Sequence, residues 1–256
     1  MKFIRYVGFI GMKGAAEQYT AGGAISVAVS GAVAEELRRY YDNINPIVIP
    51  NGINIKHFTK RQRTSCRQKY KIALDEFVVC FTARFGVLGK GFEELFALAR
   101  LAWNEQLKIR FLIATDHIPQ EWPANVTFLK NVSYEDIPEL YSLADIFVFP
   151  TRYEGCSYSL LEAMACELPV VTTQVGYAKD VYREVPEIAP FIFEKNDVEK
   201  YWKSIKLFME NPMLARKIGV VGAEYVWRNN SLDVMMDSYL NLIAKVTQKE
   251  IPSFQL

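Results

Sequence analysis

The stretch IFVFPTRYEGCSYSLLEAMACELPVVTT, residues 146–173, contains the pattern that decides the fold. It consists of an apolar run at 146–150, a polar loop, a helical pattern at 159–166 and a second apolar run at 169–173. Both apolar runs are continuous rather than alternating, which is typical of strands in a parallel sheet that is covered on both faces. The stretch therefore predicts a strand, a helix and a second, parallel strand.

The same alternation extends over most of the chain. Continuous apolar runs predict buried strands, and segments with apolar residues at helical spacing separate them. The strands are predicted at 77–83, 109–114, 126–129 and 190–193, and the helices at 92–106, 134–144 and 198–211. Strands that alternate with helices predict an α/β fold, here a Rossmann-like parallel sheet with helices on both faces.

The first fifty residues repeat this pattern on a smaller scale. Strands are predicted at 24–30 and 46–50, and Ser30 is suited to cap the helix at 32–41 because its hydroxyl can accept an early backbone N–H. Two strands and one helix are too few for a Rossmann core. We therefore expect residues 1–50 to form a small α/β remnant of a first domain.

The composition excludes several classes of protein. Of the 256 residues, 50% are hydrophobic and 23% are charged, which excludes a disordered, collagen-like or coiled-coil chain. The net charge of +1 gives no electrostatic reason to expect a nucleic acid partner. The four cysteines show no CxxC spacing, so we expect neither a zinc site nor a disulfide framework and place the protein in the reducing cytoplasm.

Two features bear on the membrane. No apolar run approaches the ~20 residues of a membrane-spanning helix, and Arg5 and Lys13 interrupt the apolar N-terminus, so we expect no signal peptide. The segment KHFTKRQRTSCRQKYK, residues 56–71, is basic and contains no acid. An anionic membrane surface would attract it at ~1 kcal/mol per residue, but the absence of an apolar face beside the charges favours a solvated helix. Membrane association is therefore expected to be peripheral at most, at the inner face.

The first candidate ligand site follows the predicted strand at 77–83. In ARFGVLGKGFEEL, residues 83–95, Gly86, Gly89 and Gly91 let the backbone approach a ligand, and Arg84 and Lys90 add two positive charges. A helix N-terminus after a glycine-rich turn binds anions. The Walker A and dinucleotide-binding spacings are absent, so a phosphate site and a plain surface turn both fit this segment.

The second candidate site is the loop and helix start at 154–162. Glu154 follows the carboxyl end of a predicted strand, where open α/β sheets bind ligands, and Glu162 lies about one turn into the next helix. The backbone N–H groups of Cys156 to Ser159 open that helix and would face the same crevice. Two carboxylates beside an anion site suit a ligand with hydroxyl groups. Alternatively, Glu162 is a solvated helix residue and Glu154 a cap.

Two further residues lie near predicted strand ends. The Cys156 thiol is a candidate for reaction with thiol reagents, although the sequence shows no partner base for a nucleophile. In the glycine turn TQVGYAKDVY, residues 173–182, Asp180 is expected to be an N-terminal charge of a helix.

These motifs together show a resemblance to a known family. Residues 126–173, VTFLKNVSYEDIPELYSLADIFVFPTRYEGCSYSLLEAMACELPVVTT, resemble the donor-binding half of the retaining glycosyltransferases of family 4, which have the GT-B fold. Glu154 and Glu162 match the Glu-x7-Glu element of that family, and Arg84, Lys90 and Gly91 match its Arg…Lys-Gly element.

The resemblance extends to the ends of the chain and implies a domain organisation. Residues 24–37 and 47–54 resemble the segment that joins the family's first domain to its second, and residues 225–243 resemble its closing helices. Residues 1–50 would then be the remnant of an acceptor-side domain, and residues 51–230 the nucleotide-sugar-binding domain. Residues 231–256 would hold a tail and a last helix that packs back on the first domain.

The resemblance also implies roles for individual residues. Arg84 and Lys90 would hold the diphosphate of a nucleotide-sugar and Glu154 hydroxyls of the transferred sugar, which makes these three the implied catalytic residues. Glu162 would take the ribose hydroxyls. The other implied donor-binding residues are Gly91, Gly155, Cys156, Ser157, Tyr158 and Ser159, with Lys130 and Asn131 against the base. No metal ion and no cofactor beyond the substrate is implied, because two cations and a helix terminus neutralise the diphosphate.

The resemblance implies a metal-independent retaining transferase of polysaccharide biosynthesis, which moves a sugar from a nucleotide-diphosphate donor to a glycan or lipid-linked acceptor. Two alternatives stay open: a non-catalytic nucleotide-sugar-binding subunit that completes a partner chain supplying the acceptor domain, and a truncated inactive product.

Three residues depart from the family pattern. Tyr158 and Ser159 stand where the family often has Leu and Pro, and Asp180 where it often has Glu.

Overall fold

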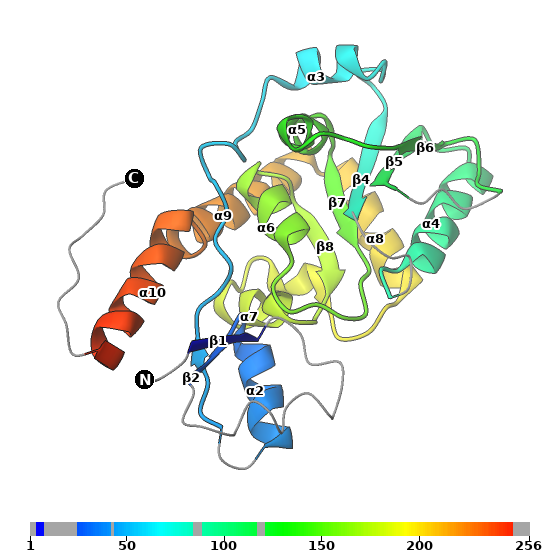
Figure 1. Ribbon diagram of the computed structural model, residues 1–256. Coiled ribbons are helices and arrows are strands. Elements are labelled where there is room, and N and C mark those ends of the chain that lie inside the picture. The colour runs from blue at the N-terminus through cyan, green and yellow to red at the C-terminus, as the bar shows by residue number, and fades with distance from the viewer. Residues whose placement is uncertain (1–3, 8–24, 42–43, 84–88, 117–120, 248–256) are drawn as a thin grey trace.

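The computed structural model describes residues 4–7, 25–41, 44–83, 89–116 and 121–247. Two parallel β-sheets organise these residues, one with three strands and one with six (Figure 1). The larger sheet and its helices confirm the predicted α/β, Rossmann-like fold.

The six-stranded sheet contains the switch point of the fold. Its strands are β4 (Phe77–Ala83), β5 (Ile109–Thr115), β6 (Val126–Leu129), β7 (Ile146–Phe149), β8 (Val170–Thr173) and β9 (Ile192–Phe193). They lie in the order β6-β5-β4-β7-β8-β9, and every neighbouring pair is parallel. The chain moves outward from β4 to β6 and then starts again at β7 beside β4. Such a reversal opens a crevice at the carboxyl ends of the strands.

Helices cover both faces of this sheet. Right-handed crossovers that run in opposite directions from the switch point place their helices on opposite faces. Figure 1 shows α5 (Ile137–Leu143) and α6 (Tyr158–Ala165) on one side of the central strands, and α4 (Phe92–Asn104) and α8 (Val198–Glu210) on the other. α7 (Tyr177–Glu184) leads into β9, and α9 (Pro212–Asn229) packs on α6. Short 3-10 turns at Tyr134–Asp136 and Ala189–Phe191 precede α5 and β9.

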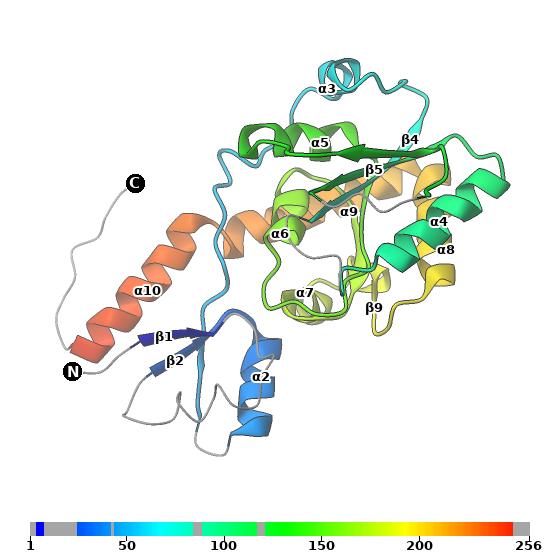
Figure 2. The same cartoon turned by 45° about the vertical axis from the view of Figure 1, so that its right-hand side comes forward.

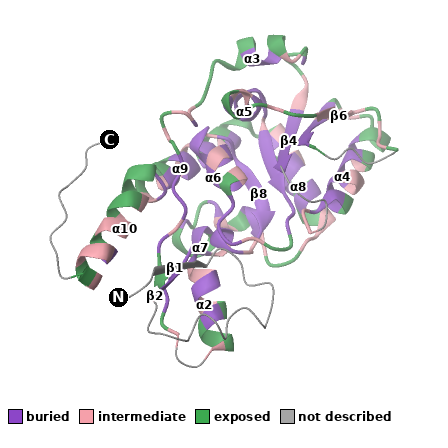
Figure 3. Cartoon of the chain, in the orientation of Figure 1, coloured by how far each residue is buried: buried purple, intermediate pink, exposed green. Residues whose placement is uncertain are grey.

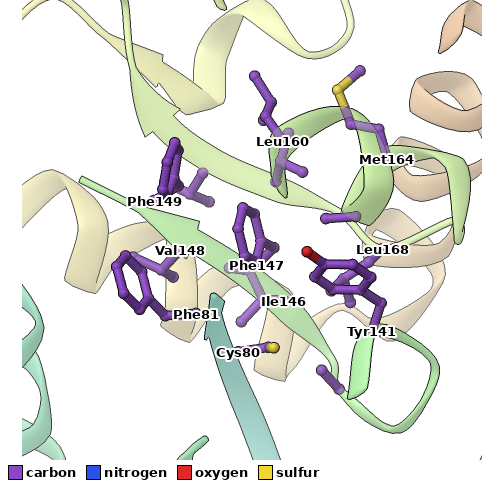
Figure 4. Close-up of a cluster of buried hydrophobic side chains, with 14 of the residues drawn as sticks. Cys80, Phe81, Tyr141, Ile146, Phe147, Val148, Phe149, Leu160, Met164 and Leu168 are labelled. Carbon is purple, nitrogen blue, oxygen red and sulfur yellow. The ribbon is translucent and has the colours of Figure 1, made fainter. Parts of the chain in front are cut away.

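β7 lies at the centre of the hydrophobic core. All four of its residues are buried, because β4 and β8 flank the strand and helices cover both of its faces (Figure 3). Figure 4 shows Phe147 of β7 near Leu160 of α6 and Tyr141 of α5, and the rings of Phe147 and Tyr141 meet edge to face at 5.7 Å. Burial on both faces is the reason why this strand is continuously apolar.

The N-terminal strands form the smaller sheet. β1 (Ile4–Val7), β2 (Ile25–Ala28) and β3 (Ile47–Val48) pair in that order. Ser30 caps the following helix, α2 (Gly31–Tyr40), as predicted: its hydroxyl oxygen accepts the N–H of Val33 at 3.1 Å. α10 (Leu232–Thr247) lies beside this sheet (Figure 2), where Leu242 packs with Val27 and Ile49. The C-terminal helix therefore contacts the first sheet, while the domain boundaries given above stay a prediction.

Several elements differ from the sequence prediction. β1 is not predicted, because Arg5 interrupts its short apolar run and only pairing with β2 makes it a strand. β9 is shorter than the predicted strand, because Pro190 lies in a 3-10 turn and cannot donate to a ladder. α9 begins well before the segment 225–243. It contains Gly219, where a Cβ would lie 2.1 Å from the carbonyl oxygen of Glu167.

The basic segment 56–71 is held against the Rossmann domain by ion pairs. Arg67 of α3 (Arg63–Lys69) is fully buried; it donates to Asp145 at 2.7 Å and to four backbone carbonyl oxygens. Further pairs join Arg63 to Asp145, Lys69 to Asp136 and Glu139, and Lys60 to Glu167. Most residues of α3 are exposed, as expected for a solvated helix, but Cys66 and Arg67 are buried. The ion pairs engage cations that an anionic membrane surface would otherwise attract. Within the described ranges, no helix is long and apolar enough to cross a bilayer.

The two parts of the chain also meet where α2 contacts α7. Glu35 of α2 accepts from Arg183 at 2.5 Å and from Lys179 at 2.8 Å. Asp180 lies in the first turn of α7, as predicted, but its carboxylate accepts the N–H of Gly31 at 2.6 Å and so caps α2 instead of its own helix. Arg183 and Lys179 lower the pKa of Glu35 from 4.5 to about 2.

We predict that Glu35→Gln lowers stability at neutral pH and has no effect in strong acid. A carboxylate with a lowered folded-state pKa stabilises the fold above its unfolded pKa, and this contribution is lost as the pH falls from 4.5 through about 2. Because the Glu35 side chain is 42% exposed, solvent screening limits the effect to ~1 kcal/mol or less. Thermal unfolding of wild type and variant across this pH range measures it.

Glu36→Gln is the matched control, since Glu36 is on the same helix and makes no ion pair with a described residue. Its effect should not depend on pH in this window. A difference in melting temperature between wild type and Glu35→Gln that persists in strong acid would contradict the assigned ion pair.

Candidate functional site

A cavity of about 690 Å³ opens at the carboxyl ends of β4, β5, β6 and β7. It therefore lies at the switch point, where doubly wound sheets bind ligands. Of the residues singled out from the sequence, Lys90, Asn131, Glu154, Glu162 and the helix start Cys156–Ser159 line it. Lys90 of the first candidate site and residues of the second therefore line one cavity.

Lys90 stands on a tight turn between two glycines. Gly89 and Gly91 have φ values of +81° and +80°, in the left-handed region that favours glycine. A Cβ at Gly91 would lie 2.1 Å from the carbonyl oxygen of Pro150, so the turn packs directly on the loop after β7. Gly91 shapes this turn and does not line the cavity. Arg84 and Gly86 lie outside the described residues, and their roles stay predictions.

Lys90 and Glu154 form an ion pair across the cavity wall. Nζ of Lys90 lies 2.5 Å from Oε1 of Glu154, and the hydroxyl of Thr151 lies 3.2 Å from the same oxygen. The residues that the resemblance assigns to phosphate and to sugar therefore contact each other. An anionic ligand bound to Lys90 would compete with Glu154 and leave this carboxylate to accept hydroxyl groups.

The N-terminus of α6 forms a second positive wall. Ser157 is the N-cap, and its hydroxyl oxygen accepts the N–H of Leu160 at 3.4 Å. The N–H groups of Tyr158 and Ser159 have no hydrogen-bond partner among the described residues. These groups and the helix dipole favour an anion in the cavity. Gly155 lies behind this wall, where its carbonyl oxygen accepts the N–H of Tyr177 at 2.9 Å.

Glu162 is oriented by residues from two other elements. Its Oε2 accepts from the hydroxyl of Tyr141 at 3.1 Å, and that hydroxyl lies 2.8 Å from Oγ1 of Thr82. Burial raises the pKa of Tyr141 well above its usual value, so the hydroxyl stays a neutral donor. Glu162 is therefore a half-buried, hydrogen-bonded carboxylate that lines the cavity, which favours a ligand-binding role over that of a solvated helix residue.

The loop after β6 closes the far side of the cavity. Asn131 has a φ of 52° and lines the cavity, whereas Lys130 is exposed and does not line it. Tyr134 and Phe58 also line this side, and the ring of Tyr134 stacks on His57 with centroids 4.4 Å apart. This aromatic wall is a surface that a planar ring can contact.

The segment that follows β3 crosses from the smaller sheet to the larger one and passes the start of α6 (Figure 2). Asn51 donates from Nδ2 to the carbonyl oxygen of Cys156 at 2.8 Å, and Asn230 donates to the carbonyl oxygen of Asn51 at 3.1 Å. The Cys156 thiol is buried, and burial raises its pKa to about 12. Burial and the raised pKa both disfavour reaction of Cys156 with thiol reagents, for which the sequence made it a candidate. The backbone of Cys156 anchors the segment that contains Asn51.

Sequence reasoning missed polar residues at two other strand ends. Thr82 near the end of β4, together with Thr115 and Asp116 at the end of β5, lines the cavity. The available signal is positional, because Thr82 and Thr115 lie at the carboxyl ends of apolar strands and Asp116 directly follows one. It becomes usable only with the strand order, which brings the ends of β4 and β5 beside that of β7.

The fold and cavity define a Rossmann-like α/β domain whose switch-point cavity brings together a lysine, a helix N-terminus and two carboxylates. Residues 62–224 match the family described as glycosyl transferases group 1. The chain therefore belongs to this family of glycosyltransferases.

Two relatives illustrate the similarity. The chain is 27% identical over 212 residues to the capsular polysaccharide biosynthesis glycosyltransferase CapM of Staphylococcus aureus, a match that covers 77% of this chain and 54% of the relative. It is 25% identical over 213 residues to a GDP-mannose-dependent monoacylated alpha-(1-6)-phosphatidylinositol monomannoside mannosyltransferase of Corynebacterium glutamicum, covering 76% and 55%. The chain thus spans about half the length of the curated relatives it matches.

Solved structures show the same fold. HepE from Anabaena, in complex with UDP, superposes with a TM-score of 0.81 at 16% identity, covering 94% of this chain and 72% of that chain. Sucrose-phosphate synthase from Thermosynechococcus elongatus has a TM-score of 0.78 at 23% identity, covering 89% and 59%. These likenesses, together with the family match, confirm the expected GT-B fold.

We predict that Gly91→Ala lowers the free energy of unfolding by ~1–3 kcal/mol. The added Cβ would be strained by the left-handed backbone and would collide with the carbonyl oxygen of Pro150. Gly222→Ala is the matched control, because a Cβ inside α9 meets its neighbours at an ordinary 3.5 Å and alanine favours a helix by ~1 kcal/mol. Denaturant midpoints measure both; equal stability of the two variants would contradict the assigned turn.

Proposed function

We propose that this protein transfers a sugar from a nucleotide-diphosphate donor to a glycan or lipid-linked acceptor, with retention at the anomeric carbon and without a metal ion. One observation carries the proposal: a single cavity gathers Lys90, the N-terminus of α6, Glu154 and Glu162. A cation and a helix end suit a diphosphate, and two carboxylates suit hydroxyl groups.

The positive walls suit the leaving group of such a transfer. In the proposal, the diphosphate lies between Lys90 and the N–H groups of Tyr158 and Ser159. Negative charge on the diphosphate grows as the sugar departs. Cation and helix end therefore stabilise the transition state more than the bound donor, which is the condition for catalysis.

The carboxylates and the aromatic wall suit the rest of the donor. Glu154, once Lys90 contacts phosphate, accepts hydroxyls of the transferred sugar, and Glu162 accepts those of the ribose. The base lies against Asn131 and Tyr134. HepE has been solved with UDP and with UDP-glucose, and the C. glutamicum relative is named as GDP-mannose-dependent. Uracil and guanine nucleotides are therefore the first donors to test.

Metal independence and retention rest on separate arguments. Lys90 and α6 supply positive charge where an ion would otherwise be needed, and the sequence has no Asp-x-Asp pair. Within the described ranges, no three His, Cys, Asp or Glu side chains gather as a metal site would require. Retention is proposed from the resemblance of the Glu154 to Glu162 block alone.

We predict that UDP or GDP, or one of their sugar conjugates, raises the melting temperature of the wild-type chain. A ligand at about one hundred times its dissociation constant adds ~2.7 kcal/mol of stability. Lys90→Ala should abolish most of the shift with diphosphates, because it removes the side-chain cation of the described cavity wall, and Glu162→Ala should weaken it through the ribose. Differential scanning fluorimetry measures both.

Lys108→Ala is the matched control, since Lys108 is paired with Asp75 beside the amino end of β5. Its thermal shift with nucleotides should equal that of the wild type. A panel in which no nucleotide stabilises the wild type, or in which Lys90→Ala responds like Lys108→Ala, would refute the donor site.

We predict that transfer, assayed with lipid-linked and free glycan acceptors, persists in EDTA and keeps the anomeric configuration of the donor. Loss of activity in EDTA would contradict metal independence, and an inverted product in the NMR spectrum would contradict retention. Donor binding without transfer to any acceptor would instead favour the alternative of a nucleotide-sugar-binding subunit.

A further inference from the structure

Arg152 joins two loops of the site without lining the cavity. Its backbone N–H donates to the carbonyl oxygen of Gly89 at 2.7 Å. Its guanidinium donates to Glu93 at 3.1 Å and to Glu94 at 2.7 Å, both in the first turn of α4. Neither Arg152 nor Glu94 is among the residues that line the cavity. Arg152 thus ties the loop after β7 to the turn that carries Lys90 and to the helix that follows.

Two ion pairs join the start of α4 to the loop after β7, and the cation comes from a different segment in each pair. In one pair, the cation Lys90 comes from the turn before α4 and the anion Glu154 from the loop after β7. In the other, the anion Glu94 comes from α4 and the cation Arg152 from the loop. The first pair faces the cavity, and the second lies outside it. A ligand can therefore break the first pair and leave the second intact.

The carboxylate of the second pair is buried and therefore depends on its cationic partner. Glu94 is 8% exposed, and among the described residues Arg152 is the cation that pairs with it. Its second oxygen, Oε2, is buried and has no hydrogen-bond partner in the described part of the chain. A buried carboxylate without a cation is strongly disfavoured. Loss of the Arg152 guanidinium would therefore leave the Glu94 carboxylate buried without a cation at the start of α4.

We infer that Arg152 is a positioning residue of the donor site, a role that rests on the proposed function. A diphosphate that takes Lys90 from Glu154 removes the cavity-side link between the two segments. The pair of Arg152 with Glu94 keeps their spacing, so that Lys90 and Glu154 stay on the two sides of the bond between phosphate and sugar. Arg152 acts through these residues and contacts no ligand.

The test compares nucleoside diphosphates with monophosphates, using UDP with UMP and GDP with GMP in isothermal titration calorimetry. Arg152→Gln should weaken binding of the diphosphate that binds the wild type by about tenfold, a loss within the range seen for neighbouring residues of one ion-pair network. Affinity for the matching monophosphate, which relies on Glu162 and the base wall, should change less than about twofold, because these groups share no partner with Arg152. A selective loss of this kind is not expected from general destabilisation.

Three variants sharpen the result. Arg110→Gln is the matched control, because Arg110 pairs with Glu76 at 2.5 Å near the amino end of β5, far from the cavity; it should leave both affinities unchanged. Arg152→Lys should restore part of the diphosphate affinity, because one ammonium can pair with Glu94 but lacks the planar fork. Glu94→Gln should show the same selective loss, and combining it with Arg152→Gln should add little, because both remove one pair.

The outcomes separate this inference from the proposed function. Binding of UDP and UMP, or of GDP and GMP, that falls equally in Arg152→Gln would overturn the positioning role, as would unchanged binding of both. The same selective loss in Arg110→Gln would overturn it as well. Failure of the wild type to bind any of the four nucleotides would refute the proposed function, and the inference with it.

Discussion

The parallel pairing of β4 with β7 is the constraint on which the rest of the structure depends. Val79 pairs with Ile146 and Cys80 with Phe147, although a long excursion through β5, β6 and α5 separates these strands in the chain. Because both strands point the same way, the segments that leave them emerge side by side at one edge of the sheet. The pairing also buries β7 on both faces, which accounts for its unbroken apolar sequence. Core and site thus follow from one contact between strands.

At that edge, the two emerging segments are held together more tightly than a surface loop would be. Gly91 brings the turn before α4 against the carbonyl oxygen of Pro150, where no larger residue fits. The charged side chains there compensate one another: half-buried Lys90 with Glu154 on the cavity side, and exposed Arg152 with buried Glu94 behind. A desolvated charge needs a partner. A ligand that binds Lys90 and displaces Glu154 must therefore also supply a hydrogen-bond donor to Glu154. A ligand that carries both phosphate and hydroxyl groups can do this, because phosphate can pair with Lys90 and a hydroxyl can donate to Glu154.

The cavity is also connected to the smaller sheet. The crossing segment at Asn51 is bonded to Cys156 at the start of α6 and to Asn230 before α10. Asn230 in turn accepts from the hydroxyl of Tyr177 in α7. On the other side, Asp180 and Glu35 join α7 to α2. Because these bonds converge on the N-terminal ends of α6 and α7, the placement of the smaller sheet and of α10 bears directly on the wall that would receive phosphate.

The sequence by itself determined the local features: the strands and helices of the Rossmann domain, the cap at Ser30, and the motif residues Lys90, Glu154 and Glu162. Hydrophobic periodicity and capping depend on neighbours within a turn or a strand, so a linear pattern is sufficient to show them. The tertiary structure alone decided which groups meet. The pairs of Lys90 with Glu154 and of Asp180 with Gly31 join residues 64 and 149 positions apart. The strand β1, the buried Cys156 thiol and the buried Arg67 likewise depend on packing between distant segments. Such contacts follow from strand order and helix packing, which the local pattern does not specify.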